Sequence, residues 1–201
     1  MLHYSMFIIQ TGIMKINGKF VFFVIMLAAL ATICKFFFGP NPDWSGFSPV
    51  IAIALFSGLI IRQKDMSFFL PLVALLISDA VIQFMYSQEL FPYAGFYSGQ
   101  WKNYLLLLGC TLIGWALKGK SYSRLAMGAV AGTTIFFLLS NFGVWLGQHA
   151  TYSKDFSGLM TCFAAGLPFY KNSLIATLVF LPGILFLYNY MIRHRAQVTL
   201  A

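Results

Sequence analysis

Six long hydrophobic runs alternate with short polar segments along the chain. A membrane-spanning helix needs about 20 predominantly apolar residues, and every run except the second and the fourth approaches that length. A small tilt or flanking polar residues can accommodate the two shorter runs. The pattern predicts an all-α integral membrane protein with six transmembrane helices. The runs cover residues 20–38, 48–61, 67–86, 103–117, 124–147 and 172–192.

Six helices use most of the 201 residues and leave too little chain for a separate soluble domain. We therefore expect a single six-helix membrane domain over residues 20–192. A cytosolic segment over residues 1–19 precedes it, and a cytosolic tail over residues 193–201 follows it.

Two interpretations of the start of the chain stay open. Residues 1–13 precede a second methionine, Met14, and are a candidate extension outside the native protein. The first apolar run also has features of a signal peptide, with Ala29-Leu30-Ala31 as a candidate cleavage site.

One segment between the last two runs has a different character. Residues 155–172, DFSGLMTCFAAGLPFYKN, are too few to cross the membrane and return as two helices. Glycine and proline near its end are typical helix terminators. We expect a short interfacial or re-entrant helix that ends at Gly166, before Pro168.

Composition and charge support this interpretation. Hydrophobic residues make up 60% of the chain and charged residues 9%, against about 25% charged in an average soluble domain. The net charge is +8, but the basic residues stand singly at the ends of the runs, so we expect no nucleic-acid partner. With the N-terminus in the cytosol, nine lysines and arginines lie inside and four outside, which predicts that both termini are cytosolic. The four outer residues are Lys35, Lys102, Lys154 and Lys171.

The third run contains an aspartate, in PLVALLISDAVIQFMY. A charge at membrane depth costs about 3 kcal/mol on insertion scales, so Asp79 should have a partner or a function. Gln83 follows Asp79 by four residues and so lies on the same helix face, and Tyr86 lies close to that face. Counting residues along the helices places Asn141 and Asn172 at a similar depth in the outer half. The four polar residues predict a layer that either lines a ligand pocket or holds the bundle together.

Aromatic residues gather in the segments expected on the outer side. Many of them fit an interfacial belt, but FPYAGFYSGQW, residues 91–101, has the glycine and aromatic content of a loop that can fold over a ligand. We expect this loop to lie above Asp79. Tyr97, Trp101 and Trp145 join the candidate binding residues.

Two further features bear on partners and chemistry. Gly128 and Gly132 are spaced for close helix packing, either inside the bundle or against another membrane subunit. The sequence has no catalytic motif, no nucleotide-binding loop and no metal-ligand spacing, so we expect no catalytic residue, cofactor or metal.

A resemblance adds to this picture. Four segments resemble an uncharacterised bacterial family of membrane transport proteins, which is similar to the S components of energy-coupling-factor vitamin transporters. The resemblance implies a six-helix bundle in the bacterial cytoplasmic membrane that binds a vitamin or precursor from the outer face. It also implies an energising membrane subunit with ATPases as partner. The segments are GFSPVIAIALFSG (46–58), PLVALLISDAVIQF (71–84), LSNFGVWLG (139–147) and GLMTCFAAGLPFYKNSL (158–174).

We therefore predict a membrane-embedded protein that binds a small molecule for uptake. Two alternatives remain at this point. One is an integral-membrane enzyme acting on a lipid or isoprenoid, which should bring a second acid, base or metal cluster to Asp79. The other is a purely structural bundle, which should fill its polar layer without a cavity.

Overall fold

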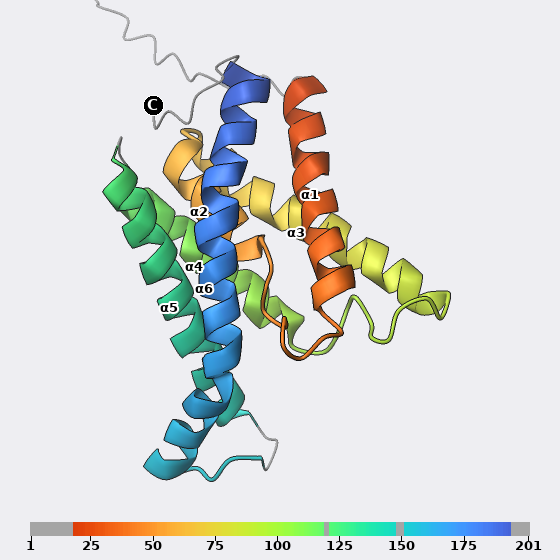
Figure 1. The fold of residues 1–201 in the computed structure, drawn as a ribbon, viewed down its shortest axis with the longest axis vertical. Helices are drawn as coiled ribbons and strands as arrows, with labels where there is room; N and C mark the ends of the chain where they lie inside the picture. Colours follow the sequence, from red (N-terminus) through yellow and green to blue (C-terminus); the bar gives the residue numbers. More distant parts are fainter. Residues whose placement is uncertain (1–17, 119–120, 148–150, 194–201) are drawn as a thin grey trace, which may run out of the picture.

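The computed structural model describes residues 18–118, 121–147 and 151–193. These residues form six α-helices and no strands (Figure 1). The helices are α1 (Gly18–Phe38), α2 (Val50–Ile60), α3 (Lys64–Ser87), α4 (Gln100–Ala116), α5 (Tyr122–Leu146) and α6 (Phe156–Arg193).

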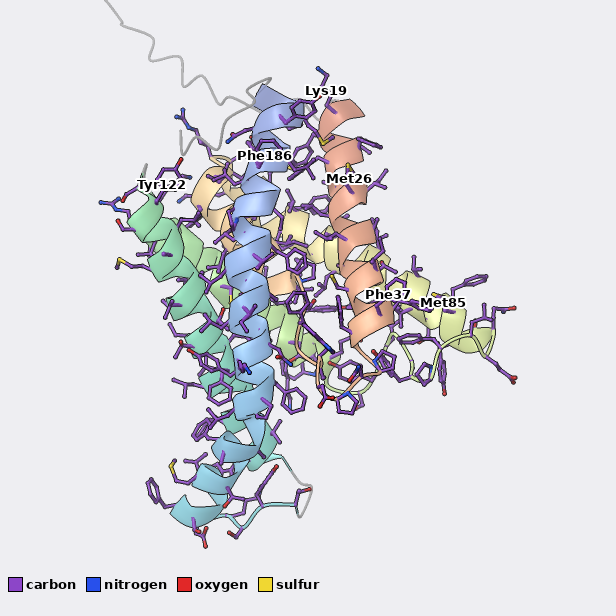
Figure 2. The ribbon with its side chains drawn as sticks, in the orientation of Figure 1. Lys19, Met26, Phe37, Met85, Tyr122 and Phe186 are labelled. Atoms are coloured by element: carbon purple, nitrogen blue, oxygen red, sulfur yellow. The ribbon has the colours of Figure 1, made fainter. Side chains whose placement is uncertain are left out.

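Four of these helices, α1, α3, α5 and α6, are long and apolar enough to cross a membrane. Their outward surfaces carry many large apolar side chains, which would be unusual in contact with water (Figure 2). Phe37 is 65% exposed and Phe186 44% exposed, for example. The predicted all-α membrane architecture is confirmed at this level.

The short helix α2 forms the centre of the bundle. Every residue from Ile51 to Ile61 is buried, and α2 packs against α3, α4, α5 and α6. A helix of 11 residues is about 16 Å long, roughly half the thickness of a bilayer core. Its apolar sequence is therefore explained by burial among other helices rather than by contact with lipid.

Small residues allow the other helices to approach α2 closely. A Cβ on Gly58 would lie 2.0 Å from the carbonyl oxygen of Thr111, and 3.0 Å from the Cα of Gly114 on α4. Gly128 and Gly132 are buried on α5, where a Cβ on Gly132 would lie 2.9 Å from Leu55 of α2. These two glycines pack inside the bundle, which is the first of the two alternatives for their spacing.

The last helix differs from the prediction. Residues 156–193 form one helix that continues through Pro168 and Pro182 instead of ending at Gly166. Proline normally interrupts a helix, but neighbouring helices can compensate in a membrane bundle. Here α5 packs along this segment. The Tyr170 ring contacts the Phe137 ring in a tilted arrangement, and its hydroxyl shares a hydrogen bond of 2.9 Å with the Thr134 hydroxyl. The predicted short interfacial helix is the first part of α6, and it extends with the end of α5 beyond the other helices (Figure 1).

The two terminal helices meet at the same end of the bundle. Figure 1 shows the start of α1 beside the end of α6, and Figure 2 places Lys19 at this end and Phe37 toward the other. The α2–α3 and α4–α5 connections also meet, since the Lys118 ammonium donates to the carbonyl oxygen of Ile61 at 3.1 Å.

Candidate functional site

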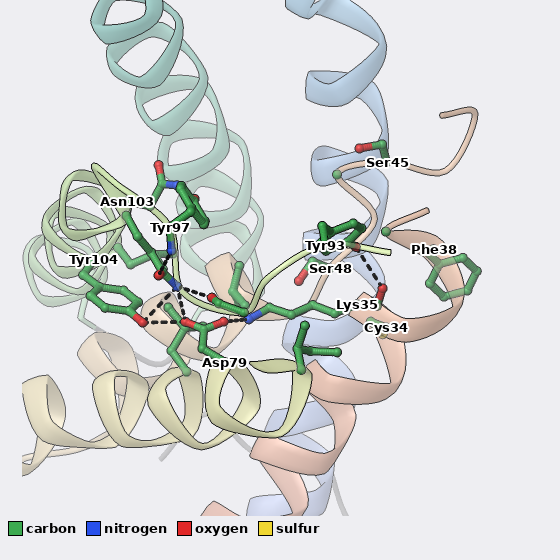
Figure 3. Close-up of a pocket in the computed structure, with 18 of the residues that line it drawn as sticks. Cys34, Lys35, Phe38, Ser45, Ser48, Asp79, Tyr93, Tyr97, Asn103 and Tyr104 are labelled. Atoms are coloured by element: carbon green, nitrogen blue, oxygen red, sulfur yellow. Dashed lines mark hydrogen bonds and ion pairs between the residues drawn. The ribbon is translucent and has the colours of Figure 1, made fainter. Parts of the chain in front are cut away.

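A cavity of about 600 Å³ lies among α1, α3, α4 and the two segments that connect α1 to α2 and α3 to α4 (Figure 3). Its walls are mainly apolar and include Phe38, Phe47, Leu75, Leu107 and Phe136. Lys35, Asp79 and Gln100 supply polar groups to the same walls. The cavity therefore has an apolar body and a small number of polar groups, as ligand sites usually do.

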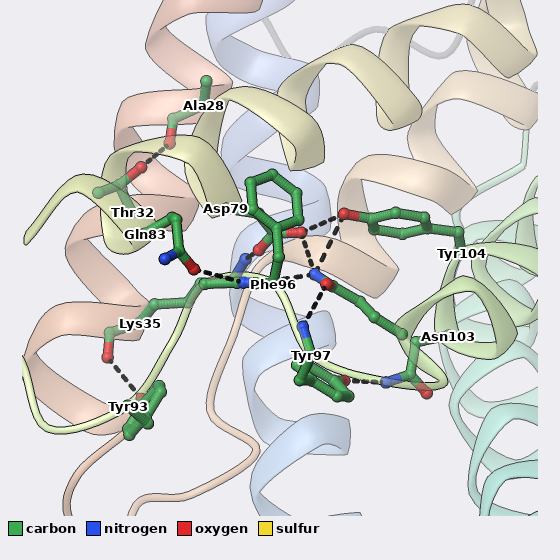
Figure 4. Close-up of polar contacts among 12 residues, drawn as sticks. Ala28, Thr32, Lys35, Asp79, Gln83, Tyr93, Phe96, Tyr97, Asn103 and Tyr104 are labelled. Carbon is green, nitrogen blue, oxygen red and sulfur yellow. Dashed lines mark hydrogen bonds and ion pairs between the residues drawn. The ribbon is translucent and has the colours of Figure 1, made fainter. Parts of the chain in front are cut away.

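Asp79 lies at the centre of the polar wall. Asp79 is 4% exposed. One of its carboxylate oxygens accepts a hydrogen bond from the Lys35 ammonium, and this contact is an ion pair between α3 and α1. The other oxygen accepts from the Gln100 amide at 2.6 Å and from the Tyr104 hydroxyl at 2.5 Å (Figure 4). A buried carboxylate needs this kind of compensation, because charge-assisted hydrogen bonds replace the lost water.

Gln100 connects the carboxylate to the α3–α4 loop. Its Nε2 lies 3.0 Å from the carbonyl oxygen of Gly95 as well as donating to Asp79, and its Oε1 accepts from the Tyr97 amide at 3.2 Å. Gln100 begins α4 and is 8% exposed. One glutamine therefore holds both the loop backbone and the buried charge in place.

The α3–α4 loop, residues 88–99, packs directly on α3. A Cβ on Gly95 would lie 2.0 Å from the carbonyl oxygen of Asp79 and 2.5 Å from the amide nitrogen of Gln83, so this position needs glycine. The Gln83 side-chain oxygen accepts from the Phe96 amide at 3.1 Å. The prediction that this loop lies against Asp79 is confirmed.

Three residues with hydroxyl groups line the cavity from the loops. The Ser48 hydroxyl is buried and has no hydrogen-bond partner among the described residues, and Ser48 lines the same cavity as Lys35 (Figure 3). Tyr97 contributes a phenol whose pKa is raised, chiefly by burial and also by the Asp79 charge, while its bond from Asn103 opposes the rise. Burial also raises the pKa of Tyr93. Both phenols are therefore protonated at neutral pH and can donate.

The sequence pattern of a family described as a family of unknown function (DUF6580) matches residues 14–199. The chain belongs to this family. No curated protein and no solved structure matches the chain. The function of this family member must therefore be argued from the cavity itself.

Three of the predicted site residues lie in or beside the cavity of this family member. Asp79 and Tyr97 line it, and Gln83 fixes the loop that covers it. Trp101 is 60% exposed and lines a second hollow between α4 and α5, and Tyr86 is 44% exposed and lines neither hollow.

The other predicted residues have separate hydrogen bonds. Asn141 donates to the carbonyl oxygen of Phe137 in its own helix at 2.9 Å, and Trp145 donates to that of Ser153 at 2.8 Å. Asn172 donates to the carbonyl oxygens of Asp43 and Ser45, at 2.8 and 2.9 Å. The prediction of one polar layer is therefore wrong: a similar depth along each helix does not fix which way a side chain points.

Three residues of the polar wall were not predicted. Lys35 looks like a topology signal in the sequence, and the third apolar run itself does not indicate Gln100 or Tyr104 as partners of Asp79. A signal for the last two exists in the sequence, because they are four residues apart and so share a helix face at the start of α4. No group of three or more histidine, cysteine or acidic residues close enough to hold a metal occurs in the described part of the chain.

Proposed function

We propose that this protein binds a small molecule in the cavity around Lys35 and Asp79, from the outer face of the membrane, for uptake into the cell. The observation that carries the proposal is an ion pair between a partly buried lysine and a buried aspartate on the wall of a mainly apolar cavity of about 600 Å³. Cavities that bind small ligands are typically about 300 to 1,000 Å³ and combine apolar walls with few polar groups.

The polar wall has unused hydrogen-bonding capacity. An ammonium group has three donors, and one of those on Lys35 is directed at Asp79. The Ser48 hydroxyl is buried and has no hydrogen-bond partner in the part of the chain that the structure describes, which costs free energy unless water or a ligand bonds to it. A ligand acceptor near these two donors would use both, while Gln100 and Tyr104 continue to hold Asp79.

The apolar walls suggest the rest of the ligand. Phe38, Phe47 and Phe136 line the cavity and offer contact to a ring or a short hydrocarbon chain. The ion pair is neutral as a whole, so a ligand that is neutral or zwitterionic preserves the charge balance of the site. We propose a vitamin- or precursor-like compound with one acceptor group and an apolar body.

The number of membrane spans and their orientation are part of the same proposal. Six spans with both termini in the cytosol are supported by the terminal helices meeting at one end and by the basic residues near the two connections there. This orientation turns the cavity toward the outer face of a bacterial cytoplasmic membrane. In this proposal the protein works as an energy-coupling-factor S component does, and an energising subunit would bind a surface other than Gly128 and Gly132.

A second candidate has one observation in its favour. Asp79 has three hydrogen-bond donors, which is enough for a purely structural carboxylate that joins α1, α3 and α4. In that case the cavity would hold nothing but water or lipid.

Extraction of co-purified compounds separates the two candidates. The protein is purified in mild detergent from membranes, and its small molecules are extracted and identified by mass spectrometry beside a mock purification. The proposal predicts one compound enriched in wild type and reduced in Ser48→Ala, which removes the donor without adding side-chain volume to the cavity. Equal extracts from wild type and mock would contradict it.

A further inference from the structure

A second hollow lies beside the cavity, between the first half of α4 and the last half of α5. It has a volume of about 1090 Å³, and several of its walls are apolar side chains on the outside of the bundle. Leu105 is 56% exposed, Leu139 50% and Val144 58%. Leu139 and Val144 belong to α5, a candidate membrane span, and Leu105 belongs to α4. We call the hollow the α4/α5 groove.

The groove and the cavity share a wall. Tyr97 and Asn103 line both of them, and the Asn103 side-chain amide donates to the Tyr97 hydroxyl at 2.5 Å (Figure 4). Tyr97 is 55% exposed, so its ring is not locked in the core. These two side chains, joined by one hydrogen bond, are the residues that the cavity and the groove have in common.

The α3–α4 loop, on another side of the cavity, is held in place by more contacts than the Tyr97–Asn103 pair. The α3–α4 loop is held to α3 by the close approach of Gly95 and by the Gln83–Phe96 hydrogen bond. It also packs on the end of α1, where a Cβ on Gly39 would lie 1.7 Å from the Tyr93 hydroxyl. Opening the cavity under the α3–α4 loop would break contacts along the loop. Opening it toward the α4/α5 groove would break one hydrogen bond, between Asn103 and Tyr97.

We infer that the ligand of the cavity is an amphiphile dissolved in the outer leaflet, which enters sideways from the α4/α5 groove past Tyr97 and Asn103. This inference rests on the proposed function and names the chemical class of its ligand. The apolar body of such a ligand fits the leucine and valine side chains of the groove, and then the aromatic walls of the cavity. Its polar end meets Lys102 at the groove and Lys35 in the cavity.

A natural reporter makes the route measurable. Cys34 lines the cavity and is 3% exposed. Replacing Cys110 and Cys162 by alanine leaves Cys34 as the sole cysteine, since the chain contains three. The protein is reconstituted in phosphatidylcholine vesicles and treated with N-dodecylmaleimide, which dissolves in the bilayer, or with a charged trimethylammonium methanethiosulfonate, which stays in water.

The inference predicts that N-dodecylmaleimide labels Cys34 and that Asn103→Ala speeds this labelling by about fivefold, the equivalent of one hydrogen bond of about 1 kcal/mol. Tyr97→Phe, which keeps the ring and removes the hydroxyl, should act in the same direction. Neither variant should speed labelling by the charged reagent. Asn141→Ala is the matched control, because its amide bonds within α5 and lines neither hollow.

Three outcomes would overturn the inference: faster labelling by the charged reagent, an equal effect of the variants on both reagents, or no labelling by N-dodecylmaleimide in wild type and both variants. Each variant is first checked for a monodisperse, helical protein. The labelling contrast does not depend on a bound ligand. A failed contrast therefore rejects the lateral route and leaves the proposed function standing, whereas an absence of co-purified ligand counts against the proposed function, on which the inference rests.

Discussion

Lys35 of α1 and Asp79 of α3, 44 residues apart in the sequence, form an ion pair on the wall of a cavity. Gln100 and Tyr104 of α4 bond to the other oxygen of the same carboxylate. One buried carboxylate thus joins three helices, and its position depends on all of its partners. The stability of the bundle and the binding of a ligand are therefore coupled at this point.

Removing one member of the pair should destabilise the protein strongly. Asp79→Asn leaves the Lys35 ammonium without its counter-ion, and we expect a loss of about 3 kcal/mol in the free energy of unfolding. The lower end of the range for buried pairs applies, because the Lys35 side chain is 24% exposed. Lys35→Met should cost a similar amount, and the double variant should cost clearly less than the sum of the two. Unfolding in mixed micelles titrated with sodium dodecyl sulfate measures all three.

The control for this cycle is another aspartate on the same helix. Asp65 is exposed in the first turn of α3, so Asp65→Asn should change the free energy of unfolding by less than about 0.5 kcal/mol. Additive costs in the double variant would show that Lys35 and Asp79 do not depend on each other.

The loop over the cavity should depend on Gly95. In Gly95→Ala the new Cβ would lie 2.0 Å from the backbone carbonyl oxygen of Asp79 on α3. The loop must therefore move away and lose the Gln83–Phe96 hydrogen bond. We expect faster hydrogen exchange at the Phe96 amide. Gly109→Ala on α4 is the matched control, because its Cβ meets nothing within 4 Å, and it should leave that exchange rate unchanged. Similar rates in both variants would argue against the close contact.

The start of α6 should be sensitive to acid. Asp155 accepts from the Gly158 amide at 2.7 Å and from the Ser153 hydroxyl at 2.8 Å, and these bonds, the first above all, lower the pKa of its carboxyl group. Its contribution to stability is present above the usual aspartate pKa, and it is lost as the pH falls through the lowered value. Asp155→Asn keeps an acceptor for the helix start but cannot titrate. The difference in thermal stability between wild type and variant should therefore shrink or reverse as the pH falls from 6 to 3. A constant difference would show that the Asp155 carboxylate does not stabilise the start of α6.

Reporter fusions test the proposed orientation. Fusions after Lys118 and after the last residue should report the cytosol, and a fusion after Gly147 should report the outside. An outside signal at either of the first two positions would contradict the six-span topology.

The helices and the buried charge could be predicted from the sequence because each depends on local pattern. Runs of apolar residues predicted the long helices, and the cost of a charge among them singled out Asp79. The placement of residues 91–101 against Asp79 followed from their glycine and aromatic content. Each of these features can be seen within about 20 consecutive residues.

The partners of Asp79 could not be predicted in the same way, because they depend on how helices rotate and tilt against one another. Asn141 and Asn172 lie at a suitable depth, yet each bonds to a backbone carbonyl elsewhere. Lys35 looks like a topology signal in the sequence, and it acts as the counter-ion only because α1 packs on α3. Continuity of α6 through Pro168 likewise depends on packing against α5.

The most direct test of ligand binding is native mass spectrometry on wild type and a variant whose cavity is filled. Val50 lines the cavity, and Val50→Trp would occupy part of its volume, whereas Val130→Trp adds the same side chain on the outer surface of α5, where Val130 is 46% exposed. The account predicts a bound non-lipid mass of defined value on wild type and on Val130→Trp, and its loss from Val50→Trp. The same mass on all three proteins, or on none, would contradict a small-molecule site in this cavity.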